Sequence, residues 1–346
     1  MKHPCDITKF AFCREKLVSK SVTIVTIMNH AQFVKDQKSA IRKALSKEAI
    51  PLKQKHARQI VMGTHQEQTC SLFWGISSQL RLETHPLLTW KFCHLLHCLI
   101  RDGHESVPLE SYRHLGRLSK LGDFWLHLHA YGEYLGFAAA NEQYCSVLGE
   151  RLEFHRKYPQ IPGNLVIPRE VLAELKDDVD RTFDASIEIL DHLKSMLLLK
   201  RRVFEALSLT EGALSPQGQT LLAPVILILS DTDTLYSIIL DLIVHLYSVC
   251  HPNALVQLRY RFENIHDQIG LFYEQARRQA YITHHVTVPT LEMLPDFERL
   301  EMIYFAARAR ELAFLNDVAE LDNEMPMAIL PESGQENQPS ALLLPD

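Results

Sequence analysis

An apolar run from Leu87 to Ile100 constrains the fold of this chain more than any other segment. Its hydrophobic residues recur at helical spacing, which predicts a helix buried in the core. They are Leu87, Leu88, Trp90, Phe92, Cys93, Leu95, Leu96, Leu99 and Ile100. The run ends at Arg101-Asp102-Gly103, where a basic residue in the last turn and a following glycine predict a left-handed helix C-cap.

Helical patterns extend over most of the remaining chain. No segment alternates between polar and apolar residues beyond a few positions, and 13 glycines are few for a β-rich fold with many tight turns. Helices are predicted over residues 32–48, from Lys53 to a break at Gly63-Thr64, over 69–79, 109–121, 179–207, 219–250 and 254–281, and from Pro168-Arg169-Glu170 onward. Helical periodicity fades after residue 310. These patterns predict an all-α fold of antiparallel helix hairpins in a stacked, curved layout.

Composition excludes several classes of protein. With 47% hydrophobic and 23% charged residues, the chain is predicted to build a large core rather than to be disordered throughout. The most hydrophobic region, residues 221–250, is interrupted by Asp231, Asp233, Asp241 and His245, so we expect buried helices there and no membrane span. The N-terminal residues lack the apolar stretch of a signal peptide. Seven scattered cysteines without a CxxC pair predict reduced thiols in the cytosol.

A basic constellation surrounds one predicted turn. Lys43 precedes Pro51, which cannot continue a helix, and Lys53-Gln54-Lys55-His56 follows it. An antiparallel reversal at this proline brings the basic side chains together. Such a cluster suits a multiply charged phosphate headgroup, and the helix N-terminus after Pro51 adds backbone N–H donors and a positive dipole end. The alternative interpretation is that these lysines are ordinary solvated residues near helix ends.

Charge is unevenly distributed along the chain. Eight lysines and arginines lie between residues 35 and 58 against two acidic residues, although the formal net charge of the whole chain is −6. Residues 316–346 carry seven acidic side chains and no basic one. A local basic face on an acidic protein favours an anionic surface or headgroup, because general nucleic-acid binding needs a broader basic footprint.

Candidate catalytic and metal-binding residues have structural interpretations that the sequence favours. His94 and His97 are three apart on one predicted helix, but no HExxH pattern or acidic ligand accompanies them. Asp231 and Asp233 resemble a carboxylate pair, yet Ser230-Asp231 follows an apolar run and is interpreted as a helix N-cap. Nucleotide-binding loops and nucleophile motifs are absent from the sequence. The sequence therefore predicts no catalytic site, no metal site and no cofactor.

Several ordered motifs accompany the basic constellation. They are Lys55-His56-Ala57-Arg58 running to Gly63-Thr64-His65, Trp90-Lys91-Phe92-Cys93-His94, Arg101-Asp102-Gly103-His104, Phe154-His155 with Pro159 and Pro162-Gly163-Asn164-Leu165, Leu222-Ala223-Pro224, and Arg259 to Phe262. On these motifs the chain resembles an ANTH domain, the phosphoinositide-binding module of endocytic clathrin adaptors, over residues 22–300. Within that family it is most similar to the huntingtin-interacting protein branch.

The resemblance implies a right-handed superhelical stack of antiparallel helices, an α-solenoid with the basic site at one end. It implies that Lys43, Lys53, Lys55 and His56 grip a phosphatidylinositol bisphosphate headgroup, either the 4,5 or the 3,5 isomer. Gln54 stands where many clathrin-assembly relatives have a basic residue. The implied location is cytoplasmic, peripheral at the plasma membrane and at clathrin-coated pits and vesicles. Clathrin, the actin machinery or another ENTH-type adaptor are the implied protein partners.

The expected organisation has three parts: an N-terminal extension (1–21), a phosphoinositide-binding domain (22–310) and an acidic, proline-containing disordered tail (311–346).

Each lysine near an anionic leaflet contributes about 1 kcal/mol, so recruitment to the membrane is expected to be modest, salt-sensitive and dependent on a second contact. An ordinary histidine pKa of about 6.5 at His56 predicts pH sensitivity between about pH 6 and 8. The competing hypothesis is a lipid-independent scaffold whose C-terminal helices dock partner helices, such as a SNARE or another adaptor. Its binding would be unaffected by charge reversal at Lys53 and Lys55.

Overall fold

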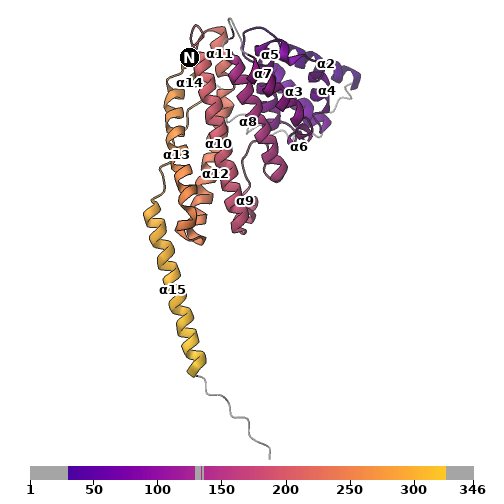
Figure 1. The fold of residues 1–346 in the computed structure, drawn as a ribbon. Coiled ribbons are helices and arrows are strands. Elements are labelled where there is room, and N and C mark those ends of the chain that lie inside the picture. Colours follow the sequence, from indigo (N-terminus) through magenta and orange to yellow (C-terminus); the bar gives the residue numbers. More distant parts are fainter. Residues whose placement is uncertain (1–29, 129–133, 135, 325–346) are drawn as a thin grey trace, which may run out of the picture. The chain divides into compact units, whose positions relative to one another are not determined.

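The computed structural model describes residues 30–128, 134 and 136–324, with side chains up to residue 315. Every regular element within these ranges is a helix (Figure 1), so the all-α prediction is confirmed for the described residues. Contacts divide the chain after Asp296 into two units, and α15 is the described element of the second.

The N-terminal half of the first unit packs helices of different lengths around one core helix. This helix is α5 (Pro86–Asp102), which begins at a proline and buries Leu87, Trp90 and Leu96 completely. The predicted core helix is therefore present. Around it lie α2 (His30–Ala44), α3 (Gln54–Glu67), α4 (Ser71–Ser77), the short 3-10 helix η1 (Leu82–Thr84), α6 (Val107–Tyr112), α7 (Leu115–His127) and α8 (Phe137–Lys157).

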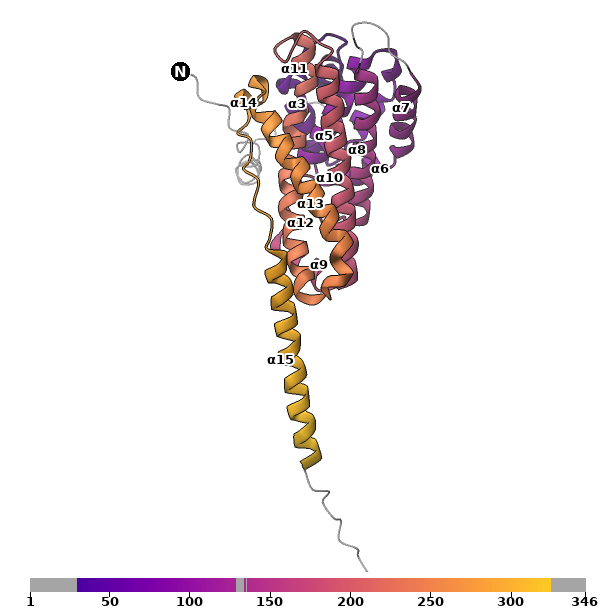
Figure 2. The ribbon, with the colours of Figure 1, turned by 60° about the vertical axis from the view of Figure 1, so that its left-hand side comes forward.

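Long helices form the C-terminal half of the first unit. α10 (Val179–Leu207) contacts α8 on one side and packs against α12 (Val225–Val249) and α13 (Pro252–Arg277) on the other. Both ribbon views show these three helices running side by side (Figures 1 and 2). Three short helices accompany them: α9 (Arg169–Lys176) precedes α10, α11 (Pro216–Leu222) connects α10 to α12, and α14 (Ala280–His285) follows α13. Because α10 contacts both halves, it joins the two groups of helices into one core.

The predicted break at Gly63 and Thr64 is wrong. α3 continues through both residues to Glu67. A Cβ atom at Gly63 would lie 2.4 Å from Nε2 of Gln37, so the absent side chain permits close contact between α2 and α3. Gln37 is buried and donates from Nε2 to the carbonyl oxygen of Gln59 at 3.0 Å. This glycine therefore marks where two helices pack together.

The predicted left-handed cap at Gly103 is also wrong. The residue has φ −76° and ψ 179°, an extended conformation open to any amino acid. A Cβ atom there would lie 2.4 Å from the carbonyl oxygen of Leu99 and 3.1 Å from Oγ1 of Thr64. The last turn of α5 therefore leaves no room for a side chain at this position, and α3 restricts it further.

Three predicted helices are divided in the structure. Residues 109–121 cross from α6 to α7, and the chain turns between them at His114, whose ring stacks on Trp74 with ring centroids 4.1 Å apart. Residues 219–250 are divided into α11 and α12 at Pro224, since proline has no N–H for a continuous helix. Residues 254–281 belong to α13 and α14.

The second unit contains α15 (Phe297–Glu324). The prediction that helical structure fades after residue 310 is wrong, because the helix continues to Glu324. Alanine, arginine, glutamate and leucine dominate its middle, all strong helix formers, and Arg308 pairs with Glu311 one turn later. The predicted N-terminal extension and the part of the predicted tail from residue 325 onward lie outside the described residues. The domain limits at residues 22 and 310 remain predictions.

Candidate functional site

The basic constellation lies on the hairpin formed by α2 and α3. Lys43 is in the last turn of α2, and Lys53 is the N-cap residue of α3 with an extended backbone. The carbonyl oxygen of Lys53 accepts hydrogen bonds from the backbone N–H groups of His56 at 2.9 Å and of Ala57 at 3.2 Å, which starts the helix. No acidic residue stands in the first turn of α3, and no side chain caps it. The positive end of the helix dipole therefore faces outward unopposed.

The structure brings all four predicted site residues together. Lys43, Lys53 and Lys55 are exposed, and His56 is half-buried. Burial lowers the pKa of His56, and the positive charges of Lys43, Lys53 and Lys55 lower it further. His56 is therefore neutral at pH 7, so the expected titration between about pH 6 and 8 moves to lower pH. Its Nδ1 atom is buried without a hydrogen-bond partner among the described residues.

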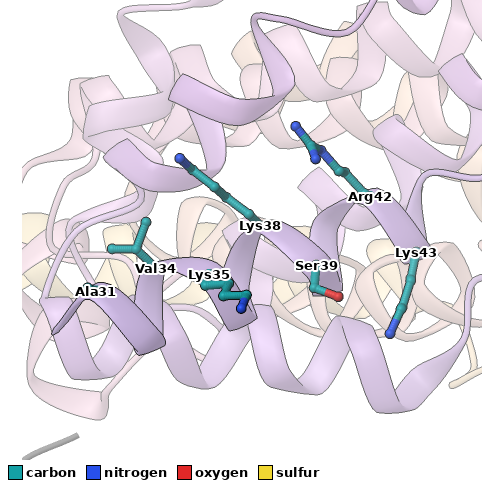
Figure 3. Close-up of a pocket in the computed structure, with 7 residues that line it drawn as sticks. All are labelled: Ala31, Val34, Lys35, Lys38, Ser39, Arg42 and Lys43. Carbon is teal, nitrogen blue, oxygen red and sulfur yellow. The ribbon is translucent and has the colours of Figure 1, made fainter. Parts of the chain in front are cut away.

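The basic surface extends beyond these four residues along both helices. A shallow pocket on the outer side of α2 is lined by Ala31, Val34, Lys35, Lys38, Ser39, Arg42 and Lys43. Lys38 and Arg42 extend side by side from one face of α2, while Lys43 leaves the helix in another direction (Figure 3). A second depression along α3 is lined by Gln54, Lys55, Arg58, Gln59 and Met62. Each depression thus includes one lysine of the predicted site.

One charged residue of this region was missed by the sequence reasoning. Lys91 comes from α5 and is only 1% exposed. Its Nζ atom donates to Oγ of Ser46 at 3.0 Å and to the carbonyl oxygen of Glu48 at 2.7 Å, both in the connection between α2 and α3. Because Lys91 stands within an apolar helical run, the sequence does not predict that it contacts the connection between α2 and α3.

The interpretation of Asp231 as a helix cap is wrong, although its role is structural. Asp231 lies inside α12 and is fully buried. Its Oδ2 atom is 2.8 Å from Nε2 of His97 and 3.4 Å from Nη1 of Arg151, and its Oδ1 atom pairs with Arg101. We call these four residues the Asp231 cluster. Asp233 does not join it, and instead accepts a hydrogen bond from the hydroxyl of Tyr273.

The interpretation of His97 as a structural histidine agrees with these contacts. Nε2 donates to Asp231, so Nδ1 accepts a hydrogen bond from the hydroxyl of Tyr144 at 3.0 Å. Burial and the nearby charges of Arg151 and Arg101 hold its pKa well below the usual range. Burial lowers the pKa of His94 to about 3. Within the described ranges, no group of three or more histidine, cysteine, aspartate or glutamate side chains is arranged to hold a metal ion.

Among the described residues, no helix is both long and apolar enough to cross a bilayer.

The fold and the site together define an all-α helical module that presents a basic cluster on one helix hairpin. The sequence model of the ANTH domain matches residues 36–299, and the chain belongs to this family. The resemblance to the huntingtin-interacting protein branch is confirmed by two relatives. The chain is 42% identical over 260 residues to "Huntington interacting protein related 1" of Caenorhabditis elegans, covering 75% of this chain and 28% of the relative. It is 34% identical over 271 residues to human "Huntingtin-interacting protein 1", covering 77% of this chain and 26% of the relative.

A solved structure shares the fold. The ENTH domain of epsin-2, determined in complex with phosphatidylinositol 4,5-bisphosphate, matches with a TM-score of 0.69 and 18% identity. The match covers 76% of this chain and 100% of that domain. The chain spans only about a quarter of the length of the two relatives.

Proposed function

We propose that this chain is the membrane-recruitment module of an endocytic adaptor. It binds a phosphatidylinositol bisphosphate headgroup through Lys43, Lys53, Lys55 and His56, and it performs no catalysis. The observation that carries the proposal is the convergence of three exposed lysines on one half-buried histidine. Among the described residues, neither an ion pair nor a hydrogen bond engages the Nζ atoms of these lysines, so their charges remain available to a ligand.

The ligand class follows from the chemistry of the cluster. Three ammonium groups attract an anion of high charge density, and the neutral imidazole of His56 adds a ring N–H donor. A bisphosphorylated inositol ring carries several phosphate oxygens that can contact all these groups at once. The solved epsin-2 domain, which shares the fold, was determined with a headgroup of this class.

The proposed setting is the cytoplasmic surface of the plasma membrane, at clathrin-coated pits and vesicles. Each lysine contributes about 1 kcal/mol near an anionic leaflet, so the cluster gives modest and salt-sensitive recruitment. Stable attachment then requires additional contacts, for which clathrin, the actin machinery and another ENTH-type adaptor are the proposed partners.

Vesicle co-sedimentation tests the proposal. Phosphatidylcholine vesicles with and without phosphatidylinositol 4,5-bisphosphate are compared for wild type and for Lys53→Glu/Lys55→Glu. Removing two lysine charges weakens binding by at least about thirtyfold, from about 1 kcal/mol per charge, and the reversed charges weaken it further. The matched control is Lys120→Glu/Lys194→Glu, which reverses two exposed lysines on α7 and α10 and leaves binding unchanged.

Two results would count against headgroup binding. If folded wild type fails to pellet with the bisphosphate, headgroup binding by this chain is refuted. If the Lys53→Glu/Lys55→Glu variant pellets like wild type, the site is wrong, and a scaffold that docks partner helices becomes the better explanation. Vesicles with the 3,5 isomer, run in parallel, report the isomer preference.

A further inference from the structure

The connection between α2 and α3 sets the spacing of the basic cluster. It comprises residues 45–53, has no regular structure, and carries Lys53 at its end. Leu45 and Leu52 are buried and anchor its two ends in the core. Its middle contains Ser46 and Glu48, the two residues that Lys91 contacts.

Lys91 is an unexpected residue at its position. A buried ammonium group costs free energy unless it is paired or hydrogen-bonded, and an apolar side chain of similar length would pack there without that cost. Two of its three N–H donors are used by the connection, through Ser46 Oγ and the carbonyl oxygen of Glu48. The same carbonyl oxygen accepts from the backbone N–H of Ile50 at 2.8 Å, which closes a local turn. Lys91 therefore holds the turn that precedes Lys53.

We propose that Lys91 is a positioning residue of the headgroup site, which fixes the connection between α2 and α3 and places a buried positive charge close to Lys53. This inference rests on the proposed function. It assigns to the core helix α5 a direct part in shaping a site that is otherwise built from α2 and α3.

The electrostatics of Lys91 support this role. Burial lowers its pKa to about 8, Glu48 raises it, and the charge of Lys53 lowers it. His85, which precedes α5, also faces Lys91 and has its pKa lowered by burial and by the charges of Lys47 and Lys91. An anion bound at Lys53 offsets the repulsion between the two lysines and raises the pKa of Lys91. Binding therefore takes up a proton near pH 8, and affinity weakens as pH rises from about 7 to 9.

Lys91→Met provides the first test, because methionine is similar in length and carries no charge. Pelleting with phosphatidylcholine vesicles that contain phosphatidylinositol 4,5-bisphosphate is measured from pH 7 to 9. At pH 7 we expect about a fivefold loss of affinity, equivalent to one lysine charge near an anionic leaflet. The variant also loses the pH dependence that Lys91 adds in wild type, while titration of the lipid is common to both proteins. Lys91→Arg, which keeps the charge, retains more of the affinity, and Lys194→Met on α10 serves as the matched surface control.

A second measurement titrates Lys91 in the wild-type protein, so it does not depend on Lys91→Met being folded. The ¹³Cε resonance of Lys91, assigned by its absence in Lys91→Arg, reports the pKa of the ammonium group. We expect this pKa to rise when inositol trisphosphate is added.

The outcomes separate this inference from the proposed function. Wild type that pellets regardless of the bisphosphate overturns both. Bisphosphate-dependent pelleting of wild type, with the same affinity and pH profile in Lys91→Met, overturns the role of Lys91 alone. An unchanged Lys91 pKa on saturation with inositol trisphosphate likewise overturns it.

Discussion

Asp231→Asn is expected to destabilise this protein strongly. The carboxylate is fully buried and faces Arg101, Arg151 and His97. At an effective dielectric constant of about 20, each close ion pair is worth about 4 kcal/mol before desolvation. Asparagine leaves the buried Arg151 guanidinium without a counter-charge and leaves Arg101 with only Asp102, whose Oδ1 is 4.0 Å from Nε of Arg101. Breaking such a buried pair costs about 3–5 kcal/mol. A domain with a typical stability of about 5–15 kcal/mol then loses a large fraction of it.

Urea unfolding followed by circular dichroism measures this loss. The matched control is Asp233→Asn, two residues away on the same helix, where the carboxylate is partly exposed and accepts one hydrogen bond from Tyr273. Asparagine can still accept that bond, so the expected cost is below about 1 kcal/mol. Equal midpoints for Asp231→Asn and Asp233→Asn, at equal slope, would refute the reasoning, because the Asp231 cluster would then carry no net stabilisation.

Two further predictions concern a loop glycine and the site histidine. Gly163→Ala should lower the free energy of unfolding by about 1–3 kcal/mol, because its Cβ would lie 1.9 Å from the carbonyl oxygen of Ile100. Gly75→Ala, with nothing within 4 Å of the new Cβ in α4, should instead raise it by about 0.5–1 kcal/mol, and equal changes in urea unfolding would contradict this. Since its pKa is lowered in the free protein, His56 should strengthen vesicle binding as pH falls below about 6.5, where a bound phosphate favours its protonated form. His56→Gln should remove that component, and superimposable pH profiles for the two proteins would exclude it.

Much of the helical fold could be predicted from periodicity and proline positions. Residues 179–207 match α10 because a long apolar pattern begins after Asp178, whose side chain accepts a hydrogen bond from the backbone N–H of Arg181 as an N-cap. Glycines were the main source of error. The sequence pattern predicts a break at Gly63 and a left-handed cap at Gly103, whereas both glycines stand where a Cβ atom would meet neighbouring atoms within 2.4 Å. The contact of Gly63 is with Gln37 on another helix, and periodicity does not identify such a partner.

In the candidate site, too, the sequence predicts features that are determined locally and misses contacts between residues distant in sequence. Four of its residues could be predicted because they flank one proline, so their proximity is decided locally by the reversal between two helices. Lys91 could not, because it reaches the site from a helix more than thirty residues further along the chain, within an apolar pattern. The same limit applies to Asp231, whose partners Arg101 and Arg151 come from α5 and α8. Their contacts exist only after the helices have packed.

If the chain binds membranes as proposed, the residues along α2 and the cluster at the hairpin contribute to membrane binding in different ways. Lys35, Lys38 and Arg42 lie along α2. Their charges attract any anionic leaflet, and this attraction weakens as the salt concentration rises. The cluster at the hairpin adjoins a connection that Leu45, Leu52 and Lys91 anchor in the core, so it is the part with a fixed geometry. Because phosphate attraction alone does not distinguish lipids, discrimination between bisphosphate headgroups must arise from this fixed geometry. Salt should therefore weaken binding to all anionic vesicles, whereas changes in the connection should alter the preference among them.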